Sequence, residues 1–168
     1  MDDFAVPRGI TTLQRNEVAL GPLLEECINN ISFRTRKKEQ VVRFQPDEQI
    51  VVNGDHDILR QLFEALLSNA SKFSPKGALI LVEAKSEAEQ VHVLVEDQGV
   101  GLTEDDITRI FQRYVILSTR ATDGESQARG TLARAKHWAE AHGGSIDAIS
   151  EGQGKGSTFN VRLPKASL

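Results

Sequence analysis

The chain has 168 residues, of which 39% are hydrophobic, enough to bury the core of one domain. Its 20 lysines and arginines against 24 aspartates and glutamates give a net charge of −4, so no basic surface exists to hold nucleic acid or an anionic membrane, and we expect neither partner. The single cysteine, Cys27, cannot form an internal disulfide, and no apolar stretch approaches the ~18 residues of a membrane span. With no secretory signal either, these features predict a reduced, cytoplasmic domain.

The first predicted elements are a strand and a helix. Segment 10–20 resembles an edge strand, and Gly21 and Pro22 then start a helix over 23–39, whose apolar residues recur at helical spacing. The basic run at 34–38 closes that helix, where cations complement the helix dipole. We interpret this run as a solvated helix end without a function.

Two short strands and a long helix come next. Segments 40–46 and 48–54 carry the valine pairs typical of strands. Asp55 can accept hydrogen bonds from the first helical amides, so the sequence predicts a helix over 55–74. The Pro-Lys-Gly segment 75–77 ends it.

The second half of the chain predicts four strands. Segments 78–84 and 90–97 are β-rich runs joined by a charged linker, the usual pattern of an antiparallel pair. A loop that runs into a helix occupies 126–144, and segments 145–150 and 157–163 predict the last two strands. Paired strands interleaved with helices predict an α+β fold, a two-layer sandwich in which about three helices cover one face of a mixed sheet.

No linker, repeat or low-complexity segment divides the chain. We therefore predict a single domain over residues 10–164. A linker stub at 1–9 precedes it and a short tail at 165–168 follows it, and both are expected to be frayed.

The long helix carries polar groups on its apolar face. Leu62, Leu66, Asn69 and Phe73 are spaced i, i+4, i+7 and i+11, so Asn69 lies within an apolar stripe, where an unpaired amide costs stability. Asn69 is either satisfied by backbone groups or meets a polar ligand. Lys72 follows on the same face, and an amide oxygen beside an ammonium could bind a metal ion and the phosphates that it bridges. Lys72 alone would more often be an ordinary surface lysine.

A second cluster follows the run 90–97. The strand ends in Asp97, and the glycines at 99 and 101 place its carboxylate beside backbone that a ligand can approach closely. The alternative is a common Asp-x-Gly-x-Gly turn. Thr103 with Asp106 three residues later predicts a helix cap, so Asp106 is interpreted as a dipole partner and not as a catalytic group.

Four short motifs occur together in an order and spacing that resemble one family. LLSNASKFSPKG at 66–77 resembles the N box of sensor histidine kinases, and DQGVGL at 97–102 resembles their first glycine box. RIFQRY at 109–114 resembles their F box, and GQGKGSTFNVRLP at 152–164 their closing glycine motif. From about residue 10 to 164 the chain resembles the catalytic, ATP-binding domain of these kinases, which belongs to the GHKL superfamily and has the Bergerat fold.

The resemblance implies roles at the base of a bound nucleotide. Asp97 would accept a hydrogen bond from the amino group of adenine, which rejects guanine because guanine presents a carbonyl there. Gly99 and Gly101 would leave room for the base. Phe73 would pack near the nucleotide.

At the phosphate end, the resemblance implies that Asn69 binds Mg²⁺ and that Lys72 meets phosphate. An arginine directed toward the phosphates is common in the family near the F box, but segment 115–116 of this chain is Val-Ile. Arg113 and Arg120 are the possible substitutes.

The glycine loop before the last helix departs from the family pattern. Gln127, Arg129 and Thr131 stand at three positions where the family has glycine. Their side chains should obstruct the approach of a phosphate to backbone amides, although Arg129 could supply charge directly. The resemblance also implies nucleotide contacts at Gly130 in this loop and at Thr158 in the closing motif.

One more difference concerns the reaction. Related ATPases place a glutamate four residues before the asparagine as the base that activates water, but this position is Ala65, and Glu64 is expected to face elsewhere on the helix. Phosphate should therefore pass to a protein and not to water. No catalytic side chain is expected beyond those that position the nucleotide.

The resemblance thus implies the ATP-binding catalytic domain of a two-component sensor histidine kinase, with ATP and Mg²⁺ as cofactors. None of the four histidines has the setting of a phosphoacceptor, so the domain would be inactive alone. It would donate the γ-phosphate to a histidine on a separate dimerisation domain of the same parent, which could be membrane-anchored, with a response regulator downstream. The alternative is a degenerate module with weak or no ATP binding that acts by protein docking, as the altered loop suggests.

Overall fold

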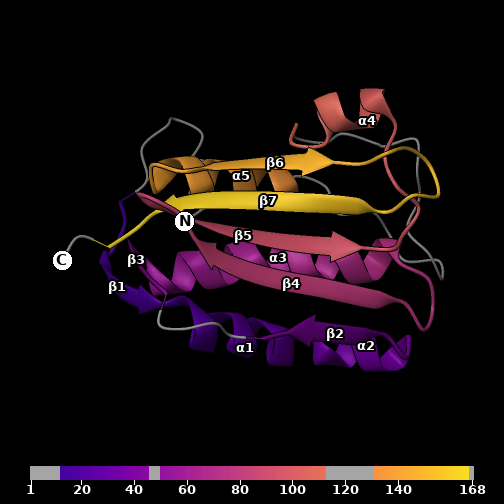
Figure 1. The fold of residues 1–168 in the computed structure, drawn as a ribbon, viewed down its shortest axis with the longest axis horizontal. Coiled ribbons are helices and arrows are strands. Elements are labelled where there is room, and N and C mark those ends of the chain that lie inside the picture. The colour runs from indigo at the N-terminus through magenta and orange to yellow at the C-terminus, as the bar shows by residue number, and fades with distance from the viewer. Residues whose placement is uncertain (1–11, 46–49, 113–130, 167–168) are drawn as a thin grey trace.

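The computed structural model describes residues 12–45, 50–112 and 131–166. Its main element is a five-stranded sheet in the order β2-β4-β5-β7-β6, with α1, α3 and α5 against one face (Figure 1). β2 pairs with β4 in parallel, and the other neighbours are antiparallel, so the sheet is mixed. The strands are β2 (Val41–Phe44), β4 (Leu79–Ser86), β5 (Gln90–Asp97), β6 (Ser145–Ile149) and β7 (Ser157–Pro164).

Five helices and a separate pair of strands complete the described chain. The pair is antiparallel and consists of β1 (Asn16–Ala19) and β3 (Val51–Gly54). The predicted α+β sandwich is confirmed. None of the described helices is both long and apolar enough to cross a lipid bilayer. The helices are α1 (Leu20–Asn30), α2 (Ser32–Lys37), α3 (His56–Phe73), α4 (Glu104–Arg109) and α5 (Thr131–Ala141).

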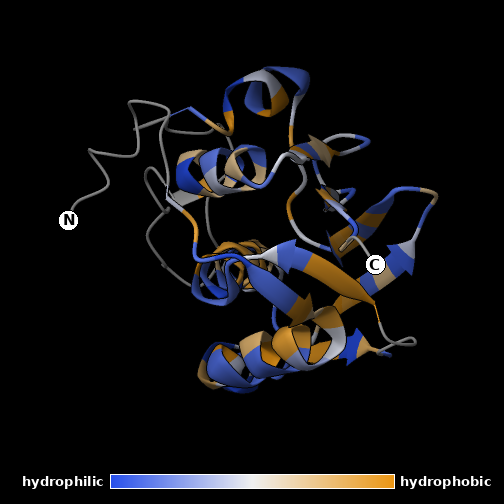
Figure 2. Ribbon diagram, turned by 90° about the vertical axis from the view of Figure 1, so that its left-hand side faces the viewer, coloured by the Kyte–Doolittle hydropathy of each residue, from blue (hydrophilic) through white to orange (hydrophobic). Residues whose placement is uncertain are grey.

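The hydrophobic core fills the layer between the sheet and the helices. Along β5, the valines at 91, 93 and 95 are buried and alternate with more exposed residues, as a strand covered on one face requires. Figure 2 shows hydrophobic stretches on both the strands and the helices, with hydrophilic residues between them. Helix α3 buries the opposite wall of the core with Leu59, Leu62, Phe63, Leu66 and Leu67.

Both predicted helix caps are present. Asp55 precedes α3, and its Oδ1 accepts a hydrogen bond from the Ile58 amide at 3.1 Å. Before α4, Thr103 and Asp106 form a reciprocal capping box, with bonds of 3.0 and 3.1 Å. Asp106 therefore has a structural role, as the sequence predicts.

The predicted helix over 23–39 is in fact two helices. Ile31 leaves helical geometry, with φ −100° and ψ 10°, and its side chain enters the core. The interpretation of the basic run as a solvated helix end is wrong for Lys38, which is 4% exposed. Its Nζ donates to the Ser71 carbonyl at 2.7 Å and to the Lys72 carbonyl at 3.3 Å. The break at Ile31 turns α2 so that this lysine reaches the end of α3.

Gln40 reinforces the same end of α3. Its Nε2 donates to the carbonyls of Ser71 at 3.2 Å, Ser74 at 3.1 Å and Pro75 at 3.2 Å. Its Oε1 accepts a hydrogen bond from the Ser71 hydroxyl at 2.7 Å. Carbonyls that the helix leaves without partners are satisfied in this way, so the last turn of α3 is held in place.

The expected frayed tail is ordered at its first two residues. The Lys165 amide donates to the Glu89 carbonyl, and the Ala166 amide donates to the Val51 carbonyl, both at 3.2 Å. These bonds tie the end of β7 to the β4–β5 turn and to β3, because β7 points toward the smaller sheet. The prediction of a tail starting at 165 is therefore too early.

Candidate functional site

Asn69 lies where two hollows of the surface meet. It is 8% exposed and lines both a narrow slot beside β7 and a larger cavity between α2, α3 and α5. No other residue in the described parts of the chain forms a hydrogen bond with its side-chain amide. A polar amide directed into a hollow, without a protein partner, is suited to a ligand. The alternative of an amide satisfied by backbone groups is therefore not what the structure shows.

The slot lies between the end of α3 and the ends of the strands. Its volume is about 10 Å³, close to that of one water molecule. A larger flat group can enter only if the side chains of the walls move. The lining includes Asn69, Phe73, Leu102, Ile110, Ser157 and Phe159.

Asp97 ends β5 next to this slot. Its Oδ1 accepts a hydrogen bond from the Gly99 amide at 2.8 Å, and its Oδ2 accepts one from the Ser157 hydroxyl at 2.9 Å. Burial raises the pKa of Asp97 above its usual value, and these two hydrogen bonds oppose the rise only in part. A buried carboxylate that no cation neutralises is typical of a recognition site.

The two glycines of the first glycine box are needed for backbone packing. A Cβ on Gly99 would overlap the carbonyl of Phe73, and one on Gly101 would overlap the carbonyl of Gly152, where φ is also +76°. The neighbouring Val100 amide donates to the Phe73 carbonyl at 3.1 Å. These glycines therefore let the loop approach α3 and the last glycine motif, a packing role in addition to the room for a base that the family resemblance implies.

The closing motif contributes Ser157 to the site. Strand residues alternate in direction, so Thr158 lies on the other face of the sheet from Ser157 and the buried Phe159. Ser157 contacts Asp97 and lines the slot, whereas Thr158 does neither. Thr158 is the residue expected from the sequence, and its neighbour Ser157 is the one that lines the slot.

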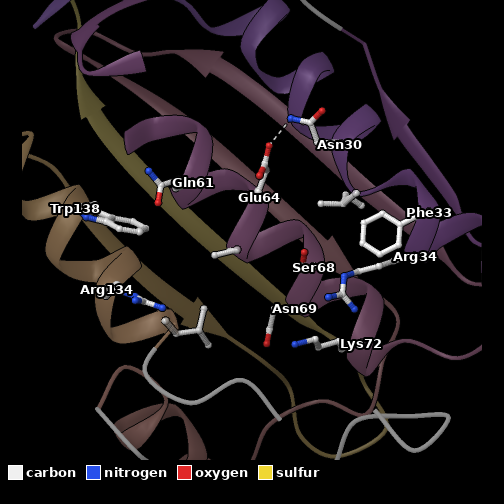
Figure 3. Close-up of a pocket in the computed structure, with 13 residues that line it drawn as sticks. Asn30, Phe33, Arg34, Gln61, Glu64, Ser68, Asn69, Lys72, Arg134 and Trp138 are labelled. Carbon is white, nitrogen blue, oxygen red and sulfur yellow. Dashed lines mark hydrogen bonds between the residues drawn. The ribbon is translucent and has the colours of Figure 1, made fainter. Parts of the chain in front are cut away.

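The larger cavity has a volume of about 430 Å³ and is bordered by cationic side chains (Figure 3). Lys72 points into it from α3 next to Asn69, as the helical spacing predicts. Arg34 of α2 and Arg134 of α5 reach it from the two sides. Trp138 forms part of the α5 wall.

Glu64 also lines this cavity, but the expectation that it does not share the face of Asn69 holds for its carboxylate. Its carboxylate is turned away from Asn69 toward Asn30, whose Nδ2 donates to it at 2.6 Å (Figure 3). Arg60 pairs with its other oxygen at 3.1 Å. Ala65 lines the cavity one residue later and brings no acid or base.

Several predicted residues lie outside the described residues. These are Arg113, Arg120, Gln127, Arg129 and Gly130, as well as the Val-Ile segment 115–116. Thr131 is the first residue of α5, and only its backbone is described. The altered glycine loop therefore ends where α5 begins, close to the cavity that Leu132 and Arg134 line.

Residues 54–167 match the family described as histidine kinase-, DNA gyrase B- and HSP90-like ATPases. The chain belongs to this ATPase family. The resemblance found in the four motifs is thereby confirmed, and the sheet with its helices is the catalytic-domain fold of sensor histidine kinases. The match includes the whole of α3, the loop after β5 and the closing glycine motif, so the site residues on these elements lie within it, whereas those on α1 and α2 lie before it.

Three proteins illustrate the similarity within this ATPase family. The sensor histidine kinase WalK of Bacillus subtilis is 34% identical over 136 residues, which are 79% of this chain and 22% of WalK. The full-length ShkA structure in complex with AMPPNP is 27% identical, with a TM-score of 0.78 over 94% of this chain and 32% of ShkA. The ThkA structure in complex with the response regulator TrrA is 22% identical, with a TM-score of 0.75 over 92% and 42% of the two chains. This chain thus spans less than half of each of these three proteins.

Some residues of this ATPase domain could not be recognised from sequence. Ser157 sits beside a threonine of similar chemistry, and only the strand register distinguishes the two. Lys38 and Gln40 hold the end of α3 from 31 or more residues away along the chain. Arg34 lies in a basic run, a pattern that usually means a solvated surface, so no sequence signal pointed to it.

Proposed function

We propose that this domain binds Mg-ATP and donates the γ-phosphate to a histidine on a separate domain. The observation that carries the proposal is the buried carboxyl group of Asp97, bonded to Ser157 of the slot, together with the Asn69 amide, which lines the same slot and has no hydrogen-bond partner among the described residues. The family is one of ATPases. The solved ShkA complex holds AMPPNP, an ATP analogue, in a protein of the same fold.

In this proposal Asp97 recognises adenine. Each of its oxygens already accepts one hydrogen bond from the protein and keeps a lone pair for a further donor. The amino group of adenine is such a donor, whereas the carbonyl of guanine would face a carboxylate. ATP is therefore expected to bind in preference to GTP.

Mg²⁺ fits the residues at the other end of the slot. In the described parts of the chain, no group of three His, Cys, Asp or Glu side chains could hold a metal. Mg²⁺ prefers one or two protein oxygens together with phosphate oxygens and water, which matches the lone amide oxygen of Asn69. When bound, it would neutralise part of the phosphate charge. Lys72, three residues later on the same helix, would hold phosphate directly.

Transfer to a protein is favoured over hydrolysis. The carboxylate nearest to Asn69 in the cavity, Glu64, is occupied by Asn30 and Arg60 and is turned away. Among the described residues that line the cavity, none is thus positioned as a general base to activate water. A histidine nitrogen of the partner domain would attack the γ-phosphorus while the bond to the bridging oxygen breaks and ADP leaves. The partners would be the dimerisation domain of the same parent and then a response regulator.

Calorimetric titration with ATP tests the nucleotide site. Micromolar binding that requires Mg²⁺, prefers ATP to GTP and is lost in Asp97→Asn would support the proposal. The absence of heat at millimolar ATP, from protein shown to be folded by circular dichroism, would refute it. That second outcome would favour the degenerate docking module, for which the substitutions at Gln127, Arg129 and Thr131 are the evidence.

A further inference from the structure

The cavity beyond Asn69 carries an excess of positive charge that no family motif explains. Among the described residues, its cationic lining side chains are Arg34, Lys72 and Arg134, and Glu64 is the one carboxylate that lines it. Glu64 is in turn paired with Arg60, outside the lining. The chain as a whole has a net charge of −4, so this local excess runs against the overall balance. Only Lys72 belongs to the four motifs of the sequence.

Arg34 is aimed at the cavity by the way α2 is anchored. It stands four residues before Lys38, on the same face of the helix. Because the ammonium of Lys38 bonds the Ser71 and Lys72 carbonyls, Arg34 lies one turn back along α3, beside Ser68 (Figure 3). The ring of Phe33 supports the guanidinium at 5.2 Å.

Arg134 approaches from the opposite wall. Helix α5 packs on the core through Leu132, Ala135 and Ala139, which are all buried. Arg134 and Trp138, one turn apart, flank this buried stripe and line the cavity. The two arginines therefore reach the Asn69 end of α3 from separate helices (Figure 3).

We propose that Arg34 and Arg134 bind the terminal phosphates of the nucleotide. This inference rests on the proposed function, and it adds two ligands outside the family motifs. One guanidinium group can donate two parallel hydrogen bonds to the oxygens of a phosphate. The distal end of a triphosphate is its most highly charged part. The altered loop lacks three of the glycines through which backbone amides would bind phosphate. Side-chain charge from α2 and α5 compensates for that loss.

The test compares two ligands on four proteins. Binding of Mg-ATP and of adenosine is measured by calorimetry for the unmodified chain, Arg34→Gln, Arg134→Gln and Arg36→Gln. Arg36 is the matched control, because it is exposed on the same helix as Arg34 and does not line the cavity. We expect Arg34→Gln and Arg134→Gln each to weaken Mg-ATP binding by roughly tenfold and to leave adenosine binding unchanged. Arg36→Gln should change neither.

Three other outcomes would contradict either the role of the two arginines or the nucleotide site itself. Equal Mg-ATP affinity in all four proteins would refute the role of the two arginines and leave the proposed function intact. Equal losses for Mg-ATP and adenosine would show that the arginines only support the fold. If the unmodified chain binds neither ligand, the proposed function fails, and this inference fails with it.

Discussion

The Ser157 hydroxyl donates a 2.9 Å hydrogen bond to the carboxylate of Asp97, and this bond joins β7 to the end of β5 at the edge of the slot. Asp97 is buried, and burial raises its pKa. The folded protein therefore keeps an acidic group in an environment that disfavours its charged form, as is common at functional sites. Variants at Asp97 and Ser157 should therefore affect folding stability and nucleotide binding differently.

Asp97→Asn should separate the two contributions. Because the pKa of Asp97 is raised in the folded state, the free energy of unfolding falls as pH rises from the usual value of 3.8 through the folded-state pKa. Asparagine cannot ionise, so the variant should have a higher free energy of unfolding at pH 7.5. Asparagine can still accept from Gly99 and donate to Ser157. The neutral amide is a weaker acceptor than a carboxylate, and its nitrogen replaces one acceptor by a donor, so ATP affinity should fall by at least about tenfold.

The measurements for Asp97→Asn are urea unfolding at pH 7.5 and pH 4 and calorimetry with ATP. The stabilisation should be larger at pH 7.5 than at pH 4. A variant that unfolds at lower urea than the unmodified protein at pH 7.5 would contradict the assignment of an unfavourable buried charge.

Ser157→Ala tests which residue of the closing motif serves the site. The change removes the donor to Asp97, so the carboxylate loses part of its orientation, and ATP affinity should fall by about threefold to tenfold. Thr158→Val is the matched control, one residue away on the other face of the sheet, and should leave ATP affinity unchanged. The reverse ranking in a calorimetric titration would restore the role first expected of Thr158.

His142 should make the fold sensitive to mild acid. Its Nε2 accepts a hydrogen bond from the Asp55 amide at 3.0 Å, and its Nδ1 donates to the Trp138 carbonyl at 2.8 Å, so the ring must be neutral. Burial lowers the pKa of His142 below its usual value of 6.5, with a contribution from Arg15 that Asp55 opposes. Stability should then be full above pH 6.5 and decrease below it, by at most about 1.4 kcal/mol per pH unit.

Urea unfolding between pH 5 and pH 8 measures this dependence. In His142→Gln the slope between pH 6.5 and pH 5 should become shallower, because the titrating ring is gone. An identical slope in the variant would assign the acid sensitivity to other groups.

Lys38→Met should destabilise the end of α3. Methionine keeps the apolar stem but removes the donor to the Ser71 and Lys72 carbonyls, so we expect a loss of about 1–3 kcal/mol in the free energy of unfolding. Lys37→Met is the control, since Lys37 is exposed on the same helix. Similar urea midpoints for the two variants would show that the buried ammonium contributes little.

Gly99→Ala should be more damaging than a glycine replacement in open space. The new methyl group would overlap the Phe73 carbonyl, and the loop after β5 would have to move, at a cost of about 3 kcal/mol or more. Gly77→Ala is the comparison: φ is +81° there, but nothing lies within 4 Å, so only the backbone strain of about 1–2 kcal/mol applies. Thermal unfolding of both variants gives the ranking, and equal losses would disprove the role of close packing.

The elements predicted correctly are those with local signals. Asp55 and Thr103 were recognised as caps because a cap involves residues two or three positions away along the chain. The antiparallel pairing of β4 with β5 follows from a short linker. The break at Ile31 was missed because helical spacing continues through it, and only the core decides where that side chain goes.

The sequence by itself determined the family, the mixed sheet and the positions of Asn69, Lys72 and Asp97, because the spacing along a helix or strand decides which side chains share a face. Only the tertiary structure decided that Ser157 contacts Asp97, that Lys38 ends α3 and that Arg34 and Arg134 meet at one cavity. Each of these contacts joins segments far apart in the chain. Their geometry depends on how the helices pack on the sheet, and no local pattern of residues encodes that packing.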